Sequence, residues 1–253
     1  MGVIFLTLYL DLIGFSLFFP LFPAMLDYYL GREGHGGALG WLLGHFDTLA
    51  RSWNIDQSAT AVLFAGVIGS LYSLLQFLFA PIWGARSDRV GRRPVLRLTI
   101  AGTTASYAIW ALSGSFLLFL LSRIVAGIAS GNLSVATAAV SDITTRADRA
   151  KGMGLIGAAF GLGFITGPAL GGLTAHWNLL DRWPGLAACG VNPFTVPALI
   201  AFALGLLNLL WVQRRFAETY TPGLAAASVE RPRHPLRALL AIPAVKDDRG
   251  ATS

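Results

Sequence analysis

The sequence has few of the residues that a water-soluble protein needs on its surface, and few that bind metals. Only 13% of its 253 residues are charged, whereas 55% are hydrophobic, and the mean hydropathy is +0.62. It contains one cysteine, Cys189, and four scattered histidines. One cysteine excludes a disulfide framework within the chain, and no residues have metal-ligand spacing. The composition therefore predicts a chain that lies in lipid and binds no metal.

Long apolar segments are what the sequence has in abundance. A helix needs about 20 apolar residues to cross about 30 Å of hydrocarbon. Six segments are long enough, at residues 2–26, 58–83, 94–113, 116–140, 152–175 and 194–212. We therefore predict an all-α membrane protein with a six-helix transmembrane domain over residues 1–215. Residues 216–253 are rich in proline, alanine and charge, and are predicted to form a cytoplasmic linker or tail.

The basic residues are divided unevenly between the two sides of these segments. All but four of the 19 lysines and arginines cluster after the second, fourth and sixth segments; the exceptions are Arg32, Arg51, Arg182 and, within the fourth segment, Arg123. Basic loops stay in the cytoplasm, so both termini are predicted to be cytoplasmic in a multi-pass protein of the inner or plasma membrane. The net charge of +6 is then a topology signal, and no nucleic-acid partner is expected.

The densest charge cluster reads GARSDRVGRRPVL and lies between the second and third segments. Its spacing is GxxxDRxGRR, in which two glycines permit a tight turn and a carboxylate can pair with nearby guanidinium groups. A positive-inside anchor would explain the arginines, but not the acid and the glycines. The residues of the pattern are Gly84, Asp88, Arg89, Gly91, Arg92 and Arg93.

This cluster resembles the signature loop between helices 2 and 3 of the major facilitator superfamily. LLSRIVAGIASG, in the fourth segment, resembles the helix 4 motif of that superfamily. LDLIGFSLFFPLFP, SDRVGRRPVL, RIVAGI and SDIT look most like tetracycline/proton antiporters, and the similarity covers nearly all of residues 5–215. The fifth segment is similar to the antiporter motif of drug/proton exchangers at Gly154, Gly163, Gly167, Pro168, Gly171 and Gly172. Close helix packing and a specific role in antiport are equally open readings of these glycines.

The resemblance implies one half of a major facilitator fold, built as two inverted three-helix repeats. It implies a proton-coupled efflux antiporter of small amphipathic or drug-like molecules that works by alternating access, with the proton gradient as driving force and no cofactor. Because the superfamily fold has twelve helices, the expected partners are the lipid bilayer, a small-molecule substrate and a second six-helix half. That half could be missing from a truncated product or be supplied by a homodimer, and a non-transporting membrane component is the alternative. No nucleophile and base have a recognisable spacing, so we predict no enzymatic activity.

Asp11 and Arg123 are the ionisable residues well inside the six segments. Each costs on the order of 2.5 to 3.5 kcal/mol at mid-bilayer on insertion scales. At 1.5 Å per residue their depths differ by roughly 5 to 7 Å, within reach of two side chains. One hypothesis is that Asp11 takes up and releases the proton while Arg123 holds it charged. The alternatives are a static ion pair that orients helices, or Arg123 snorkelling to the outer surface.

Four uncharged polar residues within the segments would be costly against lipid: Gln76, Tyr107, Asn132 and Asn208. They are predicted either to line a cavity or to form hydrogen bonds between helices. On the cytoplasmic side, the resemblance implies that Asp142 and Arg146 join the network of Asp88 that locks a cytoplasmic gate.

Overall fold

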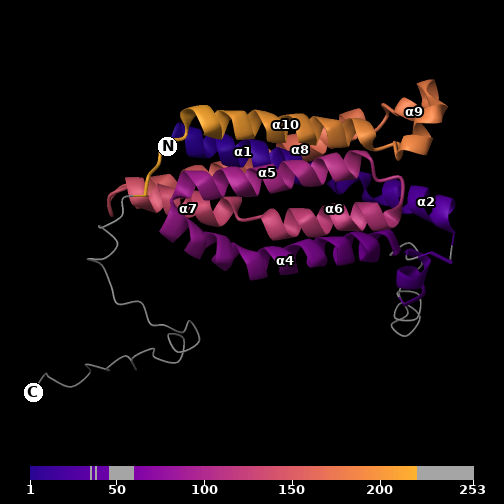
Figure 1. Cartoon of the computed structure of the whole chain (residues 1–253), viewed down its shortest axis with the longest axis horizontal. Coiled ribbons are helices and arrows are strands. Elements are labelled where there is room, and N and C mark those ends of the chain that lie inside the picture. Colours follow the sequence, from indigo (N-terminus) through magenta and orange to yellow (C-terminus); the bar gives the residue numbers. More distant parts are fainter. Residues whose placement is uncertain (35, 38, 46–59, 221–253) are drawn as a thin grey trace, which may run out of the picture. The chain divides into compact units, whose positions relative to one another are not determined.

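The computed structural model describes residues 1–34, 36–37, 39–45 and 60–220, and every regular element in them is a helix (Figure 1). Residues 39–45 form one short helix. The remaining elements are α1 Gly2–Ser16, η1 Phe19–Leu21, α2 Phe22–Glu33, α4 Thr60–Val90, α5 Arg92–Ala111, α6 Phe116–Ala129, α7 Asn132–Ile143, α8 Arg149–Thr174, α9 Leu179–Arg182, η3 Pro184–Cys189 and α10 Thr195–Arg215. The predicted start of the second segment at residue 58 and the tail beyond residue 220 lie outside the described residues.

The first predicted helix is longer than expected and is interrupted. Instead of one helix over residues 2–26, α1 ends at Ser16, the 3-10 turn η1 follows, and α2 continues to Glu33. Pro20 and Pro23 have no N–H group to donate, so an uninterrupted α-helical ladder cannot form there. The turn keeps the chain running in the same general direction, as Figure 1 shows.

The second segment extends through most of the charged cluster. α4 continues to Val90, so the prediction of a loop from Gly84 onward is wrong. Gly84 is helical and allows a close approach to α7, because a Cβ there would lie 2.9 Å from Ser134 Oγ. The turn is confined to Gly91, whose φ of 103° favours glycine, and Pro94 lies in the first turn of α5 as expected.

The fourth segment breaks in the middle, between α6 and α7. The Trp83 indole Nε1 donates a hydrogen bond to the Ile128 carbonyl at 2.6 Å, which occupies an acceptor of the helical ladder. The same ring lies against Gly131, where a Cβ would be 2.5 Å from Trp83 Cβ. α7 therefore begins anew, and Asn132 is its first residue.

Five helical stretches of the described residues are long and apolar enough to cross a membrane, namely Gly2–Glu33, Val62–Val90, Phe116–Ile143, Arg149–Arg182 and Thr195–Arg215. α5 is a 20-residue helix at the expected place, but it is not one of these five. It contacts α10, α6, α7 and α4, and Figure 1 shows it between α10 and the α6–α7 pair. Its buried hydroxyl groups, such as those of Thr99, Thr103 and Thr104, donate to carbonyls of their own helix. The predicted count of six spanning helices is therefore not confirmed by hydropathy.

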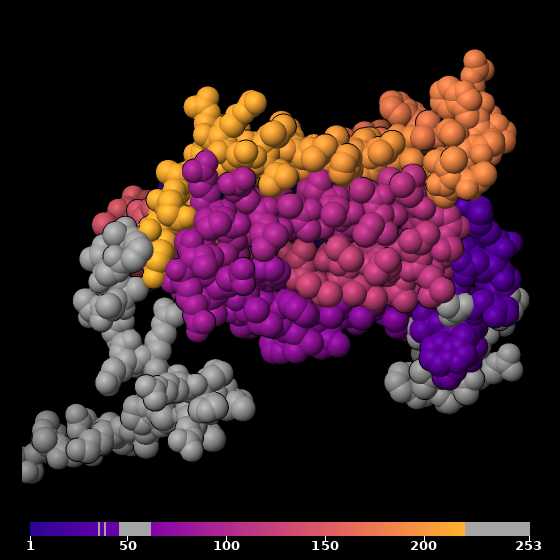
Figure 2. Space-filling model, viewed as in Figure 1, coloured from indigo at the N-terminus to yellow at the C-terminus, as the bar shows by residue number. Residues whose placement is uncertain are grey.

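The buried side chains form two hydrophobic clusters along the bundle. One is rich in aromatic rings and includes Phe18, Tyr29 and Trp110. The other is aliphatic and includes Leu96 and Val140. Figure 2 shows that α10, α5, α6 and α4 pack closely on the face in view.

The glycines of α8 pack against α1 at every fourth residue. A Cβ at Gly163 would lie 2.6 Å from Leu12 Cβ, and one at Gly167 or Gly171 would overlap Ser16 Oγ or the Leu17 carbonyl oxygen. These three glycines thus fit the close-packing interpretation. Gly154 and Gly172 do not, because a Cβ at either would have no neighbour within 4 Å. α8 stays helical through Pro168.

Candidate functional site

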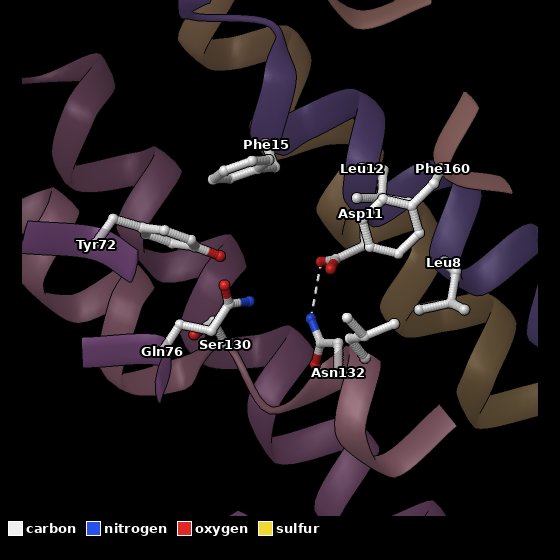
Figure 3. A pocket seen from close by; sticks show the side chains of 10 residues that line it. Leu8, Asp11, Leu12, Phe15, Tyr72, Gln76, Ser130, Asn132 and Phe160 are labelled. Carbon is white, nitrogen blue, oxygen red and sulfur yellow. Dashed lines mark hydrogen bonds between the residues drawn. The ribbon is translucent and has the colours of Figure 1, made fainter. Parts of the chain in front are cut away.

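A cavity of about 140 Å³ lies between α1, α4, α7 and α8 (Figure 3). It is partly apolar and partly polar, and its lining consists of Leu8, Asp11, Leu12, Phe15, Tyr72, Gln76, Ser130, Asn132, Leu133 and Phe160. Two residues of the predicted set of cavity-lining polar groups, Gln76 and Asn132, are among them. The predicted coupling residue Asp11 is also there.

The carboxylate of Asp11 is bound by Asn132. The Asn132 Nδ2 donates to Asp11 Oδ1 at 2.8 Å, and Figure 3 shows this bond at the edge of the cavity. Because Asn132 is the first residue of α7, the positive end of that helix dipole also lies near the carboxylate. The side chain of Asn132 is 1% exposed, and its Oδ1 has no hydrogen-bond partner among the described residues. The break between α6 and α7 is therefore what delivers a donor to Asp11.

Tyr72 and Ser130 also line the cavity, and the sequence analysis missed both. Figure 3 shows the Tyr72 hydroxyl and the Gln76 amide directed toward Asp11 from α4. Tyr72 could have been found, because it precedes Gln76 by four residues and so shares its helix face. Ser130 could not, because its place depends on the break after α6.

Tyr107 and Asn208 do not line the cavity, contrary to one of the two predictions made for them. Asn208 is 1% exposed and its Nδ2 donates to the Thr7 carbonyl at 2.9 Å, which joins α10 to α1. Tyr107 packs on Gly14, where a Cβ would lie 2.9 Å from the Tyr107 hydroxyl. For Asn208 the helix-to-helix hydrogen bond is therefore the correct alternative.

Arg123 does not meet Asp11, and the expected ion pair between them is wrong: no ion pair in the described part of the chain joins the two. The guanidinium instead lies over the rings of Phe18, Trp110 and Phe119, with Cζ 4.7, 5.4 and 5.5 Å from the ring centroids. Arg123 is 1% exposed, so it does not snorkel to the surface either. Depth along a helix does not set the direction in which a side chain points. Attraction to the aromatic faces holds this cation among the three rings and away from Asp11. The coupling roles of Asp11 and Arg123 stay predictions.

A second cluster joins α4, α5 and α7 at the C-terminal end of α4. Arg92 donates from Nη1 to Asp88 Oδ1 at 2.7 Å and from Nε to Asp142 Oδ2 at 2.8 Å. The guanidinium also donates to Ser87 Oγ at 2.6 Å. Arg92 is 5% exposed, so these contacts hold a buried cation between α4 and α7. The expected association of Asp142 with Asp88 is thus made through Arg92.

The remaining residues of the predicted gate motif lie around this cluster. The Arg93 guanidinium donates to the Gln213 carbonyl. Arg89 and Arg146 are exposed. Within residues 60–220, the ion pairs that hold Asp88 and Asp142 together are made by Arg92. The expectation that Arg146 belongs to this network is therefore not met by the structure.

Comparison with known proteins agrees with this architecture. Residues 4–247 match the sequence profile of the Major Facilitator Superfamily. The chain is 47% identical over 171 residues to the human "Major facilitator superfamily domain-containing protein 10", which covers 67% of this chain and 37% of that protein. It is 38% identical over 186 residues to the "Tetracycline resistance protein, class C" of Escherichia coli, which covers 74% of this chain and 40% of the relative.

A solved structure shares the fold. The crystal structure of the human organic anion transporter MFSD10 (TETRAN) matches with a TM-score of 0.74 and 39% sequence identity, over 86% of this chain and 47% of that one. The fold is therefore that of a multi-pass membrane transporter. The chain belongs to the Major Facilitator Superfamily and resembles tetracycline/proton antiporters. It spans less than half the length of the relatives it matches.

Proposed function

We propose that this chain is the N-terminal half of a proton-coupled efflux antiporter of small amphipathic or drug-like molecules, working by alternating access. The observation that carries the proposal is the Asp11 carboxylate at the edge of a cavity among apolar helices. Charge without a partner is costly there, so the carboxyl group favours its protonated form until a polar or cationic group in the cavity can stabilise the carboxylate. Asn132 provides one neutral hydrogen bond and no positive charge, so a proton or a substrate can complete the site.

The lining also indicates which substrates fit. Phe15, Tyr72 and Phe160 offer aromatic surface, and Gln76 and Asn132 offer amide groups. Among the described residues that line the cavity none is basic, and Arg123 faces its own aromatic cluster. This half therefore favours neutral or cationic amphipathic molecules over anions.

The proposal includes a second six-helix half, supplied by a longer chain or by a second copy, with the substrate bound between the two halves. We also propose that both termini are cytoplasmic, as the distribution of basic residues predicts, and that the Asp88–Arg92–Asp142 cluster is a lock on the cytoplasmic side. The second half is supported by the relatives, since the matched part of each is less than half of its length.

A flux assay tests the function. The chain is reconstituted into proteoliposomes that carry a pH gradient and an internal pH dye, and tetracycline is added. We expect the gradient to dissipate in a substrate-dependent way that protein-free vesicles do not show. Vesicles that also contain the second half of the class C tetracycline resistance protein distinguish a missing half from a lack of activity. No dissipation in either preparation contradicts the proposal.

Reversing the charge of Asp88 tests the proposed lock. We expect Asp88→Arg to change the transport rate about tenfold and the substrate affinity much less, because it breaks the ion pair with Arg92 far from the cavity. Initial rates over a range of substrate concentrations separate the two effects. The control is Asp148→Arg, an equally drastic change at an exposed acid that pairs with Lys151 instead. A rate unaltered by Asp88→Arg argues against gating.

A further inference from the structure

A carboxylate far along the chain caps the helix that follows the charged cluster. Glu218 Oε1 accepts a hydrogen bond from the Arg92 backbone N–H at 2.8 Å, and its Oε2 accepts one from the Arg93 N–H at 3.1 Å. These are the first N–H groups of α5, which have no acceptor within the helix. A negative charge is also favourable at this end of the helix dipole. Gly91, at the N-cap position, has no side chain that could do the same locally.

The close approach of Glu218 gives Gly91 a second reason to be glycine. Besides its φ of 103°, a Cβ at this position would lie 2.5 Å from Glu218 Oε2. The glycine of the signature pattern therefore makes room for a side chain 127 positions away as well as for the turn between α4 and α5.

The segment that carries Glu218 is itself held in place. Phe216 is 3% exposed and packs in the aliphatic cluster with Leu96 and Val140. Glu218 Oε1 also accepts from the backbone N–H groups of Thr219 and Tyr220, each at 3.1 Å. The carboxylate is thus oriented by its own segment as well as by the N–H groups of α5.

We propose that Glu218 is a positioning residue of the Asp88–Arg92–Asp142 cluster: it holds the backbone of Arg92 so that the guanidinium can bridge Asp88 and Asp142. The backbone and the side chain of Arg92 are bound from different elements, by Glu218 beyond α10 and by carboxylates on α4 and α7. The ring of Tyr220 adds a contact, with its centroid 5.8 Å from Arg92 Cζ. That the cluster acts as a gate rests on the proposed function, whereas the positioning of Arg92 does not.

Hydrogen exchange measured by NMR on the chain in lipid nanodiscs tests this directly. In the wild type, the Arg92 and Arg93 amides should exchange slowly although they begin a helix. Glu218→Gln should speed exchange at least tenfold at both amides and also at the Arg92 Nε–H, because glutamine offers one acceptor oxygen and no charge. Acceleration of the backbone amides alone would mean that Glu218 is only a helix cap, and it overturns the positioning role. Unchanged exchange at all three groups overturns the proposal as well.

The chain offers a matched control at the opposite end of the bundle. Glu33 Oε1 accepts from the Phe116 N–H at 2.7 Å at the start of α6. Glu33→Gln should therefore speed exchange at Phe116 and leave Arg92 unchanged. If Glu218→Gln does not fold, the wild-type rates decide, since fast exchange at Arg92 and Arg93 overturns the proposal. If Glu218→Gln slows turnover and leaves KM unchanged, the positioning of Arg92 is connected to gating. If the exchange pattern is as predicted but the wild type shows no flux, the proposed function is wrong and the positioning role stands.

Discussion

Replacing Asp11 with asparagine is expected to abolish proton-coupled flux while leaving expression and helical content intact. Asparagine has nearly the same shape and its oxygen can still accept from Asn132, but it cannot bind and release a proton. The measurement compares two activities in proteoliposomes: substrate-driven dissipation of a pH gradient, which should disappear, and exchange of labelled substrate without a gradient, which should persist. Coupling that survives in Asp11→Asn removes this residue from the proposed mechanism.

A second acidic residue controls for the loss of a charge as such. Asp27 lies on α2 and is exposed, outside the cavity lining. Asp27→Asn makes the same chemical change and should keep normal coupling. If both variants lose coupling equally, the effect of Asp11→Asn would reflect net charge or folding instead of the cavity carboxylate.

Replacing Gly171 with alanine is expected to destabilise the folded chain more than a glycine-to-alanine substitution elsewhere on α8. The new Cβ would overlap the carbonyl oxygen of Leu17, and a backbone atom cannot rotate away as a flexible side chain can. Overpacking of this kind typically costs about 1–3 kcal/mol. The melting temperature of the purified chain in detergent should therefore fall by several degrees, with less folded protein recovered from the membrane.

The neighbouring glycine provides the comparison. A Cβ at Gly172 meets nothing within 4 Å, so Gly172→Ala should leave the melting temperature unchanged or raise it slightly, because alanine is the better helix former by about 1 kcal/mol. Equal melting temperatures for the two variants would contradict the packing of α8 on α1 described above. Both glycines belong to the same antiporter-like spacing. A difference in melting temperature between the two variants would therefore come from helix packing and not from membership of the motif.

Much of the architecture is legible in the sequence, because crossing a bilayer demands a length and an apolarity that composition reveals. The helices near residues 152–175 and 194–212 are present as α8 and α10 with small shifts of their ends. The charged cluster indicated the family, and Asp11, Gln76 and Asn132 were identified as unusual because polar groups among apolar helices need a partner. The helix predicted at residues 94–113 is present as α5, but it is not among the five described helical stretches apolar enough to cross a membrane. It contacts α10, α6, α7 and α4, and such contacts lower the need for apolar residues on its surface.

The partners of these polar groups depend on the packing of the helices. Position along a helix predicts depth, and on depth alone Asp11 and Arg123 were expected to meet. In the folded chain the break made by Trp83 and Gly131 starts α7 at Asn132 and brings its amide to Asp11. Arg123 lies among aromatic rings, and Glu218 reaches a helix that begins 126 residues earlier. Such contacts depend on the rotation of each helix about its axis and on breaks made by distant side chains, and neither is encoded in local spacing.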